Sequence, residues 1–212
     1  MNELGAKQSR LAGQMSNLLG GKMTVGRFRN RQPYWSKDLY FDILTVHGGI
    51  LADTITSSTL GLSGYQIKDH EKGRPPVRSE LLAAIRNDTD FEMLTGDAAD
   101  GNNFLEKNLL YMSSYMVGET WYCTAGTLWV NYFSNQYDTF STVEHLLFTS
   151  PSFFMKVPDT INFEGHLIQW LLCVPITGPE LALAEKRGVD ALEQLLIREK
   201  VDFTDLFRAS LV

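Results

Sequence analysis

The sequence predicts an α+β fold: a mixed central β-sheet flanked by helices, ending in a strand, a tight turn and two helices. Two observations carry this expectation. The run from 167 to 174 is apolar at nearly every position, which is typical of a strand buried on both faces of a sheet. Helix-like and strand-like segments also follow one another irregularly instead of alternating, which disfavours a doubly wound α/β fold.

A helix-start signal follows the apolar run. Thr177 and Glu180 have the spacing of a capping box, in which each side chain accepts a hydrogen bond from the backbone amide of the other. We expect Pro175 to end the strand, because proline has no N–H to donate to a ladder. We expect Gly188 to end the helix with a left-handed cap, after which a second amphipathic helix begins at Val189.

The composition is that of a globular protein with one core. The chain has 212 residues, of which 44% are hydrophobic and 21% charged, so one main domain is the simplest organisation. Its net charge of −6 argues against nucleic-acid binding and leaves a basic protein partner open. We find no secretory signal, and no apolar run approaches the roughly 18 residues of a membrane span. We therefore expect a cytoplasmic protein with no membrane partner.

Residues 1–36 differ from the rest of the chain. Positive charges gather there against a single acid, Glu3, and several glycines interrupt any long helix. An amphipathic helix before Gly20 could form an arm that binds a membrane surface or a partner. A poorly ordered or loosely docked terminus is the alternative that we favour. We therefore treat residues 1–36 as an N-terminal extension to a main domain at residues 37–212.

The remaining elements follow from local patterns in chain order. Asn102 or Asn103 is the expected cap of the one long helix, whose apolar residues repeat at helical spacing. The expected elements are a strand at 40–46 ended by Gly48, the helix at 104–117, short strands at 121–123 and 127–133, a strand at 142–149, and a hairpin-like segment at 155–163 that leads into the apolar run.

Aromatic residues are dense between 119 and 140. Because tryptophan and tyrosine often dominate binding interfaces, this segment is our first choice for an exposed recognition surface. Plain core packing is one alternative, and a ligand pocket lined by the aromatic rings is another. The candidate partner-binding residues are Trp121, Trp129, Tyr132 and Tyr137.

The sequence contains candidate catalytic and metal-binding residues, but their spacing does not fit either kind of site. Glu144 and His145 form the most tempting acid–base pair, but neighbours on a strand point to opposite faces, so we expect them not to share a site. The segment TGDAADGNN at 95–103 lacks the ligand spacing of a calcium loop. Cys123 and Cys173 have no metal-binding spacing, so we expect buried free thiols. We therefore expect no cofactor, no metal and no enzymatic activity.

Three blocks of sequence carry a resemblance to a known family. The most specific is Val174–Leu196, which reads V-P-I-T and then E-L-x-x-A-x-x-x-G-V-D-A-L-E-x-L-L. The others are His145–Phe148, which reads H-L-L-F, and Arg78–Ile85, which contains E-L. Together they resemble the Suppressor of fused domain over roughly 39–208. The resemblance implies a strand at 77–85, although propensity alone favours a helix there.

What the resemblance implies is a non-enzymatic domain that binds another protein. In the animal relatives the partner is a transcription factor of the Hedgehog pathway, held as an added strand. Bacterial relatives act as immunity proteins that neutralise a toxin in the same cell, and we expect this bacterial, single-domain type. An acidic binder suits a basic toxin. The partner-contact region of the animal relatives corresponds to roughly 46–55, and we carry over Asp53.

Two questions stay open at this point. The alternative function is a small-molecule-binding protein or an enzyme that uses an aromatic-lined pocket around residues 121–140. The sequence also leaves the oligomeric state unknown.

Overall fold

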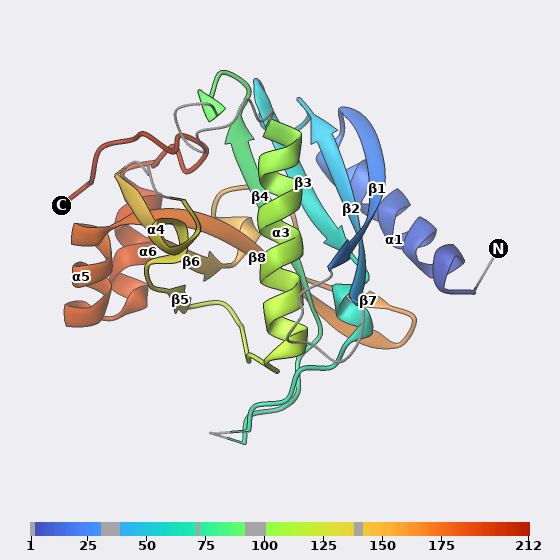
Figure 1. Ribbon diagram of the computed structural model, residues 1–212. Coiled ribbons are helices and arrows are strands. Elements are labelled where there is room, and N and C mark those ends of the chain that lie inside the picture. Colours follow the sequence, from blue (N-terminus) through green and yellow to red (C-terminus); the bar gives the residue numbers. More distant parts are fainter. Residues whose placement is uncertain (1–2, 31–38, 71–72, 92–100, 138–141) are drawn as a thin grey trace.

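The computed structural model describes residues 3–30, 39–70, 73–91, 101–137 and 142–212. One extended sheet runs through the molecule, with helices on both faces (Figure 1). The helices are α1 (Glu3–Leu19), α3 (Gly101–Gly118), α4 (Tyr132–Gln136), α5 (Gly178–Arg187) and α6 (Val189–Arg198), with short 3-10 turns η1 (Leu62–Gly64) and η2 (Pro151–Phe153). The strands are β1 (Lys22–Asn30), β2 (Leu39–His47), β3 (Thr54–Leu60), β4 (Ser79–Arg86), β5 (Thr127–Trp129), β6 (Val143–Thr149), β7 (Thr160–Phe163) and β8 (His166–Thr177).

The sheet is mixed, as predicted. Its strand order is β1-β2-β3-β4-β8-β6-β5, and β7 pairs with the first part of β8. The β4–β8 pair is parallel, and the other pairs are antiparallel. The strand expected at 77–85 from the family resemblance is β4, so burial in the sheet overrides the local helix propensity of that segment. The hairpin expected before the apolar run is β7–β8.

The apolar strand β8 lies at the centre of the sheet and is buried on both faces, as predicted. Leu171 and Cys173 pack into the core under α3 and α4, whereas Trp170 and Leu172 pack into the core under α1, α5 and α6. The expectation that Pro175 ends the strand is wrong, because β8 continues to Thr177. The pairing of β4 with β8 ends at Leu172, so no ladder hydrogen bond is lost on that side when proline follows.

The junction of β8 and α5 has the predicted capping box. The Thr177 hydroxyl accepts from the amide of Glu180, and the Glu180 carboxylate accepts from the amide of Thr177 at 3.0 Å. Gly188 ends α5 with a positive φ of 89°, but its ψ of 154° lies outside the left-handed helical region that we expected. The chain leaves α5 extended and enters α6 at once, burying Leu192 and Leu196.

Residues 3–30 lie on the sheet rather than forming the loosely docked terminus that we favoured. α1 buries Leu11, Met15 and Leu19 against the same core as α5 and α6. β1 pairs with β2 along its whole length, from Lys22 opposite His47 to Asn30 opposite Leu39. Burial of these apolar side chains therefore stabilises α1, although Gly13 in its middle disfavours a helix. The division after residue 36 into an N-terminal extension and a main domain stays a prediction.

The middle of the chain departs from the sequence expectations in three places. α3 begins at Gly101, so Asn102 and Asn103 lie inside the helix rather than capping it. Residues 121–123 form no strand, and the strand expected at 127–133 stops at Trp129. Asn131 then adopts a left-handed φ of 56° and starts α4. The segment examined as a calcium loop falls partly outside the described residues, which omit 92–100.

The C-terminal tail is fixed across the end of the sheet by a buried ion pair. Both guanidinium Nη atoms of Arg208 donate to the Glu180 carboxylate, at 2.6 and 2.7 Å. Burial alone raises the pKa of Glu180, but the hydrogen bonds and charge of Arg208 outweigh it and hold this pKa below its ordinary value. The carboxylate is therefore ionised at neutral pH. The ion pair between Arg208 and Glu180 holds the tail in place just after residues 201–206.

Candidate functional site

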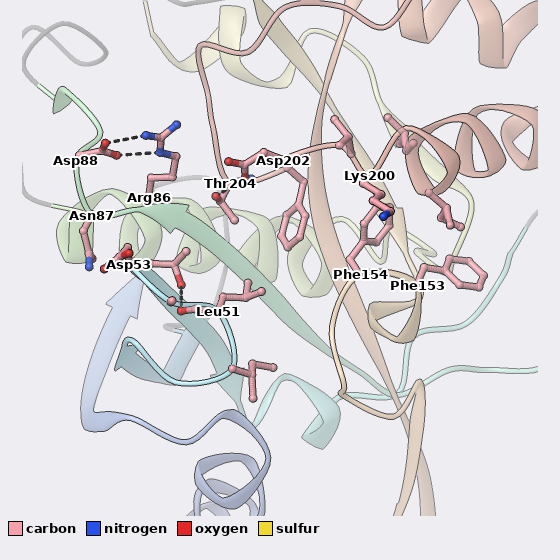
Figure 2. Close-up of a pocket in the computed structure, with 17 residues that line it drawn as sticks. Leu51, Asp53, Arg86, Asn87, Asp88, Phe153, Phe154, Lys200, Asp202 and Thr204 are labelled. Carbon is pink, nitrogen blue, oxygen red and sulfur yellow. Dashed lines mark hydrogen bonds and ion pairs between the residues drawn. The ribbon is translucent and has the colours of Figure 1, made fainter.

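A surface hollow of about 880 Å³ lies where four segments of the chain meet. We call this feature the hollow. It is formed by the β2–β3 turn, the end of β4, the η2 turn, and the segment that runs from the end of α6 into the tail (Figure 2). Its lining residues are Ile50, Leu51, Ala52, Asp53, Thr54, Arg86, Asn87, Asp88, Phe153, Phe154, Leu196, Ile197, Lys200, Val201, Asp202, Phe203 and Thr204.

Asp53, the residue carried over from the family resemblance, lies in the hollow. Its φ of 55° is left-handed, a conformation that aspartate tolerates better than most residues. The turn is held by the Asn87 amide, which donates to the Asp53 carbonyl at 2.9 Å, and by the Thr54 hydroxyl, which donates to the Leu51 carbonyl at 2.8 Å. The Asp53 side chain is exposed, and among the described residues its carboxylate has no hydrogen-bond or ion-pair partner.

A charged pair forms a second side of the hollow. Arg86 donates through Nε and Nη2 to the two carboxylate oxygens of Asp88, at 2.9 and 2.7 Å. These hydrogen bonds lower the pKa of Asp88 and raise the pKa of Arg86. The Arg86 amide also donates to the Thr204 carbonyl at 3.2 Å, which ties the end of β4 to the tail. Because both charged groups are exposed, this pair adds little to stability.

Exposed apolar side chains gather at the same place. Phe153 is 47% exposed, Ile197 is 39% exposed and Ile50 is 37% exposed. Phe154 beside them packs its ring on Phe203, with centroids 5.4 Å apart, and so gives the hollow a fixed apolar wall. These side chains come from three segments that are far apart in the sequence, so the patch is a product of the fold.

The hollow combines apolar side chains with a few charged ones. Histidine, cysteine and serine do not occur among its lining residues, and the Thr204 hydroxyl is engaged by Asp202 at 2.6 Å. The lining carries three aspartates against Arg86 and Lys200, which leaves a small excess of negative charge around an apolar patch. An apolar centre with charged groups around it is also the arrangement found in many protein interfaces.

The four aromatic candidates pack on the core under α3 and α4, whereas Leu196 and Phe203 of the hollow belong to the other core. We call Trp121, Trp129, Tyr132 and Tyr137 the aromatic cluster. Tyr132 is 1% exposed, and the other three side chains are partly buried. Trp129 packs on Trp121 with ring centroids 4.7 Å apart and on Tyr132 at 4.9 Å. Packing is what the structure shows of these residues, and their role as partner contacts stays a prediction.

Hydrogen bonds also hold the aromatic cluster closed. The Tyr132 hydroxyl donates to the Asn108 side-chain oxygen at 2.8 Å, and the Asn108 amide nitrogen donates to the Tyr137 hydroxyl at 2.8 Å. Asn108 is itself buried on α3. Burial raises the pKa of Tyr132 well above its ordinary value and also raises the pKa of Tyr137. Both hydroxyls are therefore neutral hydrogen-bonding groups at any physiological pH.

The space beneath the aromatic cluster is too small for a metabolite. The cavity lined by Tyr132, Phe133 and Asn108 measures about 30 Å³. Small-molecule pockets usually measure about 300–1,000 Å³, so this void has room for little more than one water. Its geometry offers no support for a ligand pocket at residues 121–140 in the part of the chain that the structure describes.

The side chains of Glu144 and His145 lie close together, contrary to the expectation that they point to opposite faces of the strand. They do approach each other, with 3.7 Å between Glu144 Oε2 and His145 Nε2. The reason is a β-bulge between Val143 and His145, which breaks the alternation of faces that we assumed. His145 Nδ1 accepts from the amide of Asn131 at 2.8 Å, and burial lowers the pKa of this imidazole. His145 thus holds the left-handed entry to α4.

Other chemistry is sparse in the described ranges. No three histidine, cysteine or acidic side chains there are arranged to hold a metal ion. Cys123 and Cys173 are free and buried, and burial raises the pKa of both thiols. None of the described helices combines the length and apolarity that crossing a membrane requires.

Sequence reasoning reached only Asp53 among the residues of the hollow. It missed Phe153, Ile197 and the Arg86–Asp88 pair. The available signal was weak: two adjacent phenylalanines follow a strand and Pro151, where a turn is expected. Nothing local predicts that this turn meets the end of α6.

Comparison with known proteins identifies relatives along most of the chain. The family model described as "Suppressor of fused protein (SUFU)" matches residues 38–209. A protein of Bacillus subtilis (strain 168) named "Immunity protein YqcF" is 29% identical over 196 residues, which cover 91% of each chain.

Solved structures share the fold. A putative SUFU homolog from Neisseria gonorrhoeae has a TM-score of 0.60 at 14% identity, covering 100% of this chain and 96% of the other. A chain of the Sufu–Fu complex has a TM-score of 0.63 at 14% identity, covering 98% and 91%. Drosophila Suppressor of Fused has a TM-score of 0.53, and the match spans 42% of that longer chain.

Proposed function

Because this chain belongs to the Suppressor of fused family, we propose that it is a non-enzymatic protein-binding domain that binds its partner at the hollow. We propose further that it is a cytoplasmic immunity protein and that the partner is a toxin of the same cell, which it neutralises by binding. The relative named as an immunity protein supports the second part, since it matches this chain along nearly its whole length.

One observation carries the proposed site. Three of the exposed large apolar side chains, Ile50, Phe153 and Ile197, meet at one hollow that also holds the exposed Asp53 carboxylate. Exposing this much apolar surface in one place is unfavourable unless a partner covers it. Central apolar anchors surrounded by polar groups are the usual source of affinity in protein interfaces.

The charge of the hollow sets the kind of partner. Its lining has one more negative than positive charge, and the whole chain carries −6. A basic partner would gain association rate from this field, and the gain would fall as salt is added. A basic toxin fits both the charge and the family.

The test uses the protein as bait in its native cell, with matched variants. Wild type and a Phe153→Asp, Ile197→Asp double variant are compared with Leu167→Asp, which places the same charge on a 66% exposed apolar residue away from the hollow. We expect one stoichiometric protein to be captured by wild type and by Leu167→Asp and lost from the double variant. Equal capture by all three would remove the hollow from the interface.

The toxin part is tested by co-expression. The captured protein is expressed in a test host alone and together with wild type or the double variant. We expect growth arrest by the captured protein alone, rescue by wild type and no rescue by the double variant. A captured protein that leaves growth unaffected would refute the immunity role and leave the binding role standing.

A further inference from the structure

A separate cavity of about 490 Å³ is lined by parts of α1, the η1 turn and the β7–β8 hairpin. We call it the Arg78 pocket, after the lining residue that precedes β4. Small-molecule sites usually measure about 300–1,000 Å³, so the Arg78 pocket has room for one. None of the described residues lines both this pocket and the hollow, so the two are distinct sites.

One wall of the Arg78 pocket is fixed by a buried carboxylate. Glu80 has no exposed surface and accepts from the backbone amides of Gly61 and Ser63, at 2.8 and 3.1 Å. The hydroxyls of Ser63 and Thr59 also donate to it, each at 2.6 Å. These hydrogen bonds hold the η1 turn in one conformation, so this wall is already formed before a ligand binds.

The guanidinium of Arg78 has one edge that no described residue contacts. Its Nη1 donates to the carbonyls of Ser63 and Gly64, at 2.8 and 3.1 Å, and this holds the side chain against the η1 turn. Its Nε and Nη2 have no hydrogen-bond or ion-pair partner in the described ranges. These two nitrogens are therefore the donors that Arg78 can offer to a bound molecule.

Two other arginines of the same chain show what this edge binds. Nε and Nη2 of Arg27 donate to the two carboxylate oxygens of Asp42, at 2.7 and 2.9 Å. The same two atoms of Arg86 donate to Asp88, at 2.9 and 2.7 Å. Two parallel N–H donors match the two oxygens of a carboxylate. Arg78 has the same pair of donors free in the pocket, which indicates a carboxylate ligand.

The charge of the pocket also favours an anion. Glu164 is the only acid among its described lining residues, and it is paired with Arg10 of α1. Arg78 is therefore the one full charge of this lining without a counter-charge in the described part of the chain. A locally positive site in a chain of net charge −6 is a place where an anion is favoured over a cation.

The rest of the lining suits a flat apolar group. Tyr40 is 48% exposed and Tyr65 is 36% exposed, and Leu11 and Ile168 are buried beside them. The Tyr65 ring packs on Phe41 with centroids 5.8 Å apart, which limits its movement. Aromatic rings prefer to pack on other rings in tilted or offset arrangements, so two exposed tyrosines favour an aromatic ligand over an aliphatic one.

We propose that the Arg78 pocket binds a small aromatic carboxylate. The carboxylate accepts from Nε and Nη2 of Arg78, and the aromatic ring packs on Tyr40 and Tyr65. Because the bound molecule contacts α1, the η1 turn and the β7–β8 hairpin together, it also strengthens the attachment of α1 to the sheet. This binding is separate from the partner binding proposed for the hollow.

The test titrates naphthylacetate into the intact, isotope-labelled chain and follows its amide NMR signals. We expect saturable changes at residues 61–65 and 166–168, with a Kd of about 1 mM or tighter for a ligand of this size. Naphthylacetamide has the same shape without the charge and should bind at least about tenfold more weakly. Equal binding of the acid and the amide, or no binding of the acid up to about 10 mM, would overturn the proposal.

A first pair of variants tests the guanidinium. Arg78→Gln removes the two parallel donors, so naphthylacetate should bind at least about tenfold more weakly. Arg198→Gln makes the same change at a side chain that is 71% exposed and lies outside the pocket, and it should leave the affinity unchanged. Equal weakening in both variants would show a general effect of charge and would contradict a site at Arg78.

A second pair of variants fills space and leaves Arg78 intact. A Cβ added at Gly64 or at Gly13 would meet no atom within 4 Å, and neither glycine has a positive φ, so both positions accept a side chain. Gly64 lines the Arg78 pocket and Gly13 does not. Gly64→Leu should therefore weaken naphthylacetate at least about tenfold without loss of stability, and Gly13→Leu should leave its affinity unchanged. Wild-type affinity in both Arg78→Gln and Gly64→Leu would refute the proposal.

Discussion

The hollow and the aromatic cluster both contain large apolar side chains but differ in what those side chains contact. In the aromatic cluster, rings pack on rings at 4.7–4.9 Å and the Tyr132 hydroxyl is bound by Asn108. In the hollow, Phe153 and Ile197 extend into solvent and the Asp53 carboxylate has no partner among the described residues. The side chains of the aromatic cluster contact other parts of the same chain. In the hollow, Phe153, Ile197 and the Asp53 carboxylate are exposed to solvent and can contact a partner.

This difference shows that aromatic density in a sequence does not by itself distinguish a binding surface from a packed core. Tryptophan and tyrosine are as useful for filling a core beside a short strand as for binding a partner. Exposed apolar side chains next to uncompensated charge indicate a binding surface more directly. The comparison predicts that the cluster controls stability and the hollow controls binding.

The largest expected effect is on stability, at Tyr132. Tyr132→Ala removes a fully buried ring and leaves the Asn108 oxygen without its donor, so the free energy of unfolding should fall by about 3–5 kcal/mol. Tyr132→Phe keeps the ring and should cost about 1–3 kcal/mol. Denaturant unfolding followed by fluorescence measures both. A loss below about 0.5 kcal/mol in Tyr132→Ala would show that the cluster is loosely packed.

The next effect is on binding, at Phe153. Phe153→Ala removes an exposed anchor of the hollow, so the partner's binding free energy should weaken by about 2 kcal/mol, roughly 30-fold in Kd. Its stability should change by no more than about 0.5 kcal/mol, because the ring is half exposed. Calorimetric titration with the captured partner and a matched unfolding curve separate the two quantities. The reverse pattern, with stability lost and Kd retained, would make Phe153 a packing residue.

Alkaline pH should affect the cluster before the hollow. The pKa of Tyr132 is raised well above its unfolded value near 10, so its hydroxyl ionises more readily in the unfolded chain. Its contribution to stability is therefore complete below about pH 10 and is lost as pH rises toward the folded pKa. Unfolding curves measured through this range should show falling stability, with a shallower fall in Tyr132→Phe. Identical slopes in the two proteins would place the titrating groups elsewhere.

The smallest expected effects are at Asp53, where different substitutions test the carboxylate charge and the left-handed backbone separately. Asp53→Asn tolerates the left-handed φ of 55° and removes only the charge, so stability should hold while Kd for a basic partner weakens severalfold. Asp53→Ala should also lose about 1 kcal/mol of stability to backbone strain, which Asp53→Gly avoids. Unchanged binding in Asp53→Asn would remove the carboxylate from the interface.

Local signals explain which parts of the fold could be predicted. The strand at 167–174 and the capping box of Thr177 and Glu180 are read from neighbouring residues, and both are present. Pro175 and the bulge at His145 could not be read this way, because each depends on where a neighbouring strand pairs. The family resemblance was needed for β4, whose residues taken alone favour a helix.

The candidate site was less predictable, because it is assembled from distant segments. Asp53 came from the family resemblance, but its neighbours in the hollow come from the end of β4, the η2 turn and the end of α6. The spacing of residues along the sequence does not show which distant segments come into contact in the fold. The packing of α1 was underestimated for the same reason, since its apolar residues gain stability only from the sheet that covers them.

Hydrogen exchange with and without the captured partner tests the central claim most directly. If the hollow binds the partner, amides at 50–54, 86–88 and 196–204 should exchange more slowly in the complex, while those of the aromatic cluster at 121–137 keep their rates. Protection confined to 121–137, with the hollow unchanged, would contradict the account and return the binding surface to the aromatic residues.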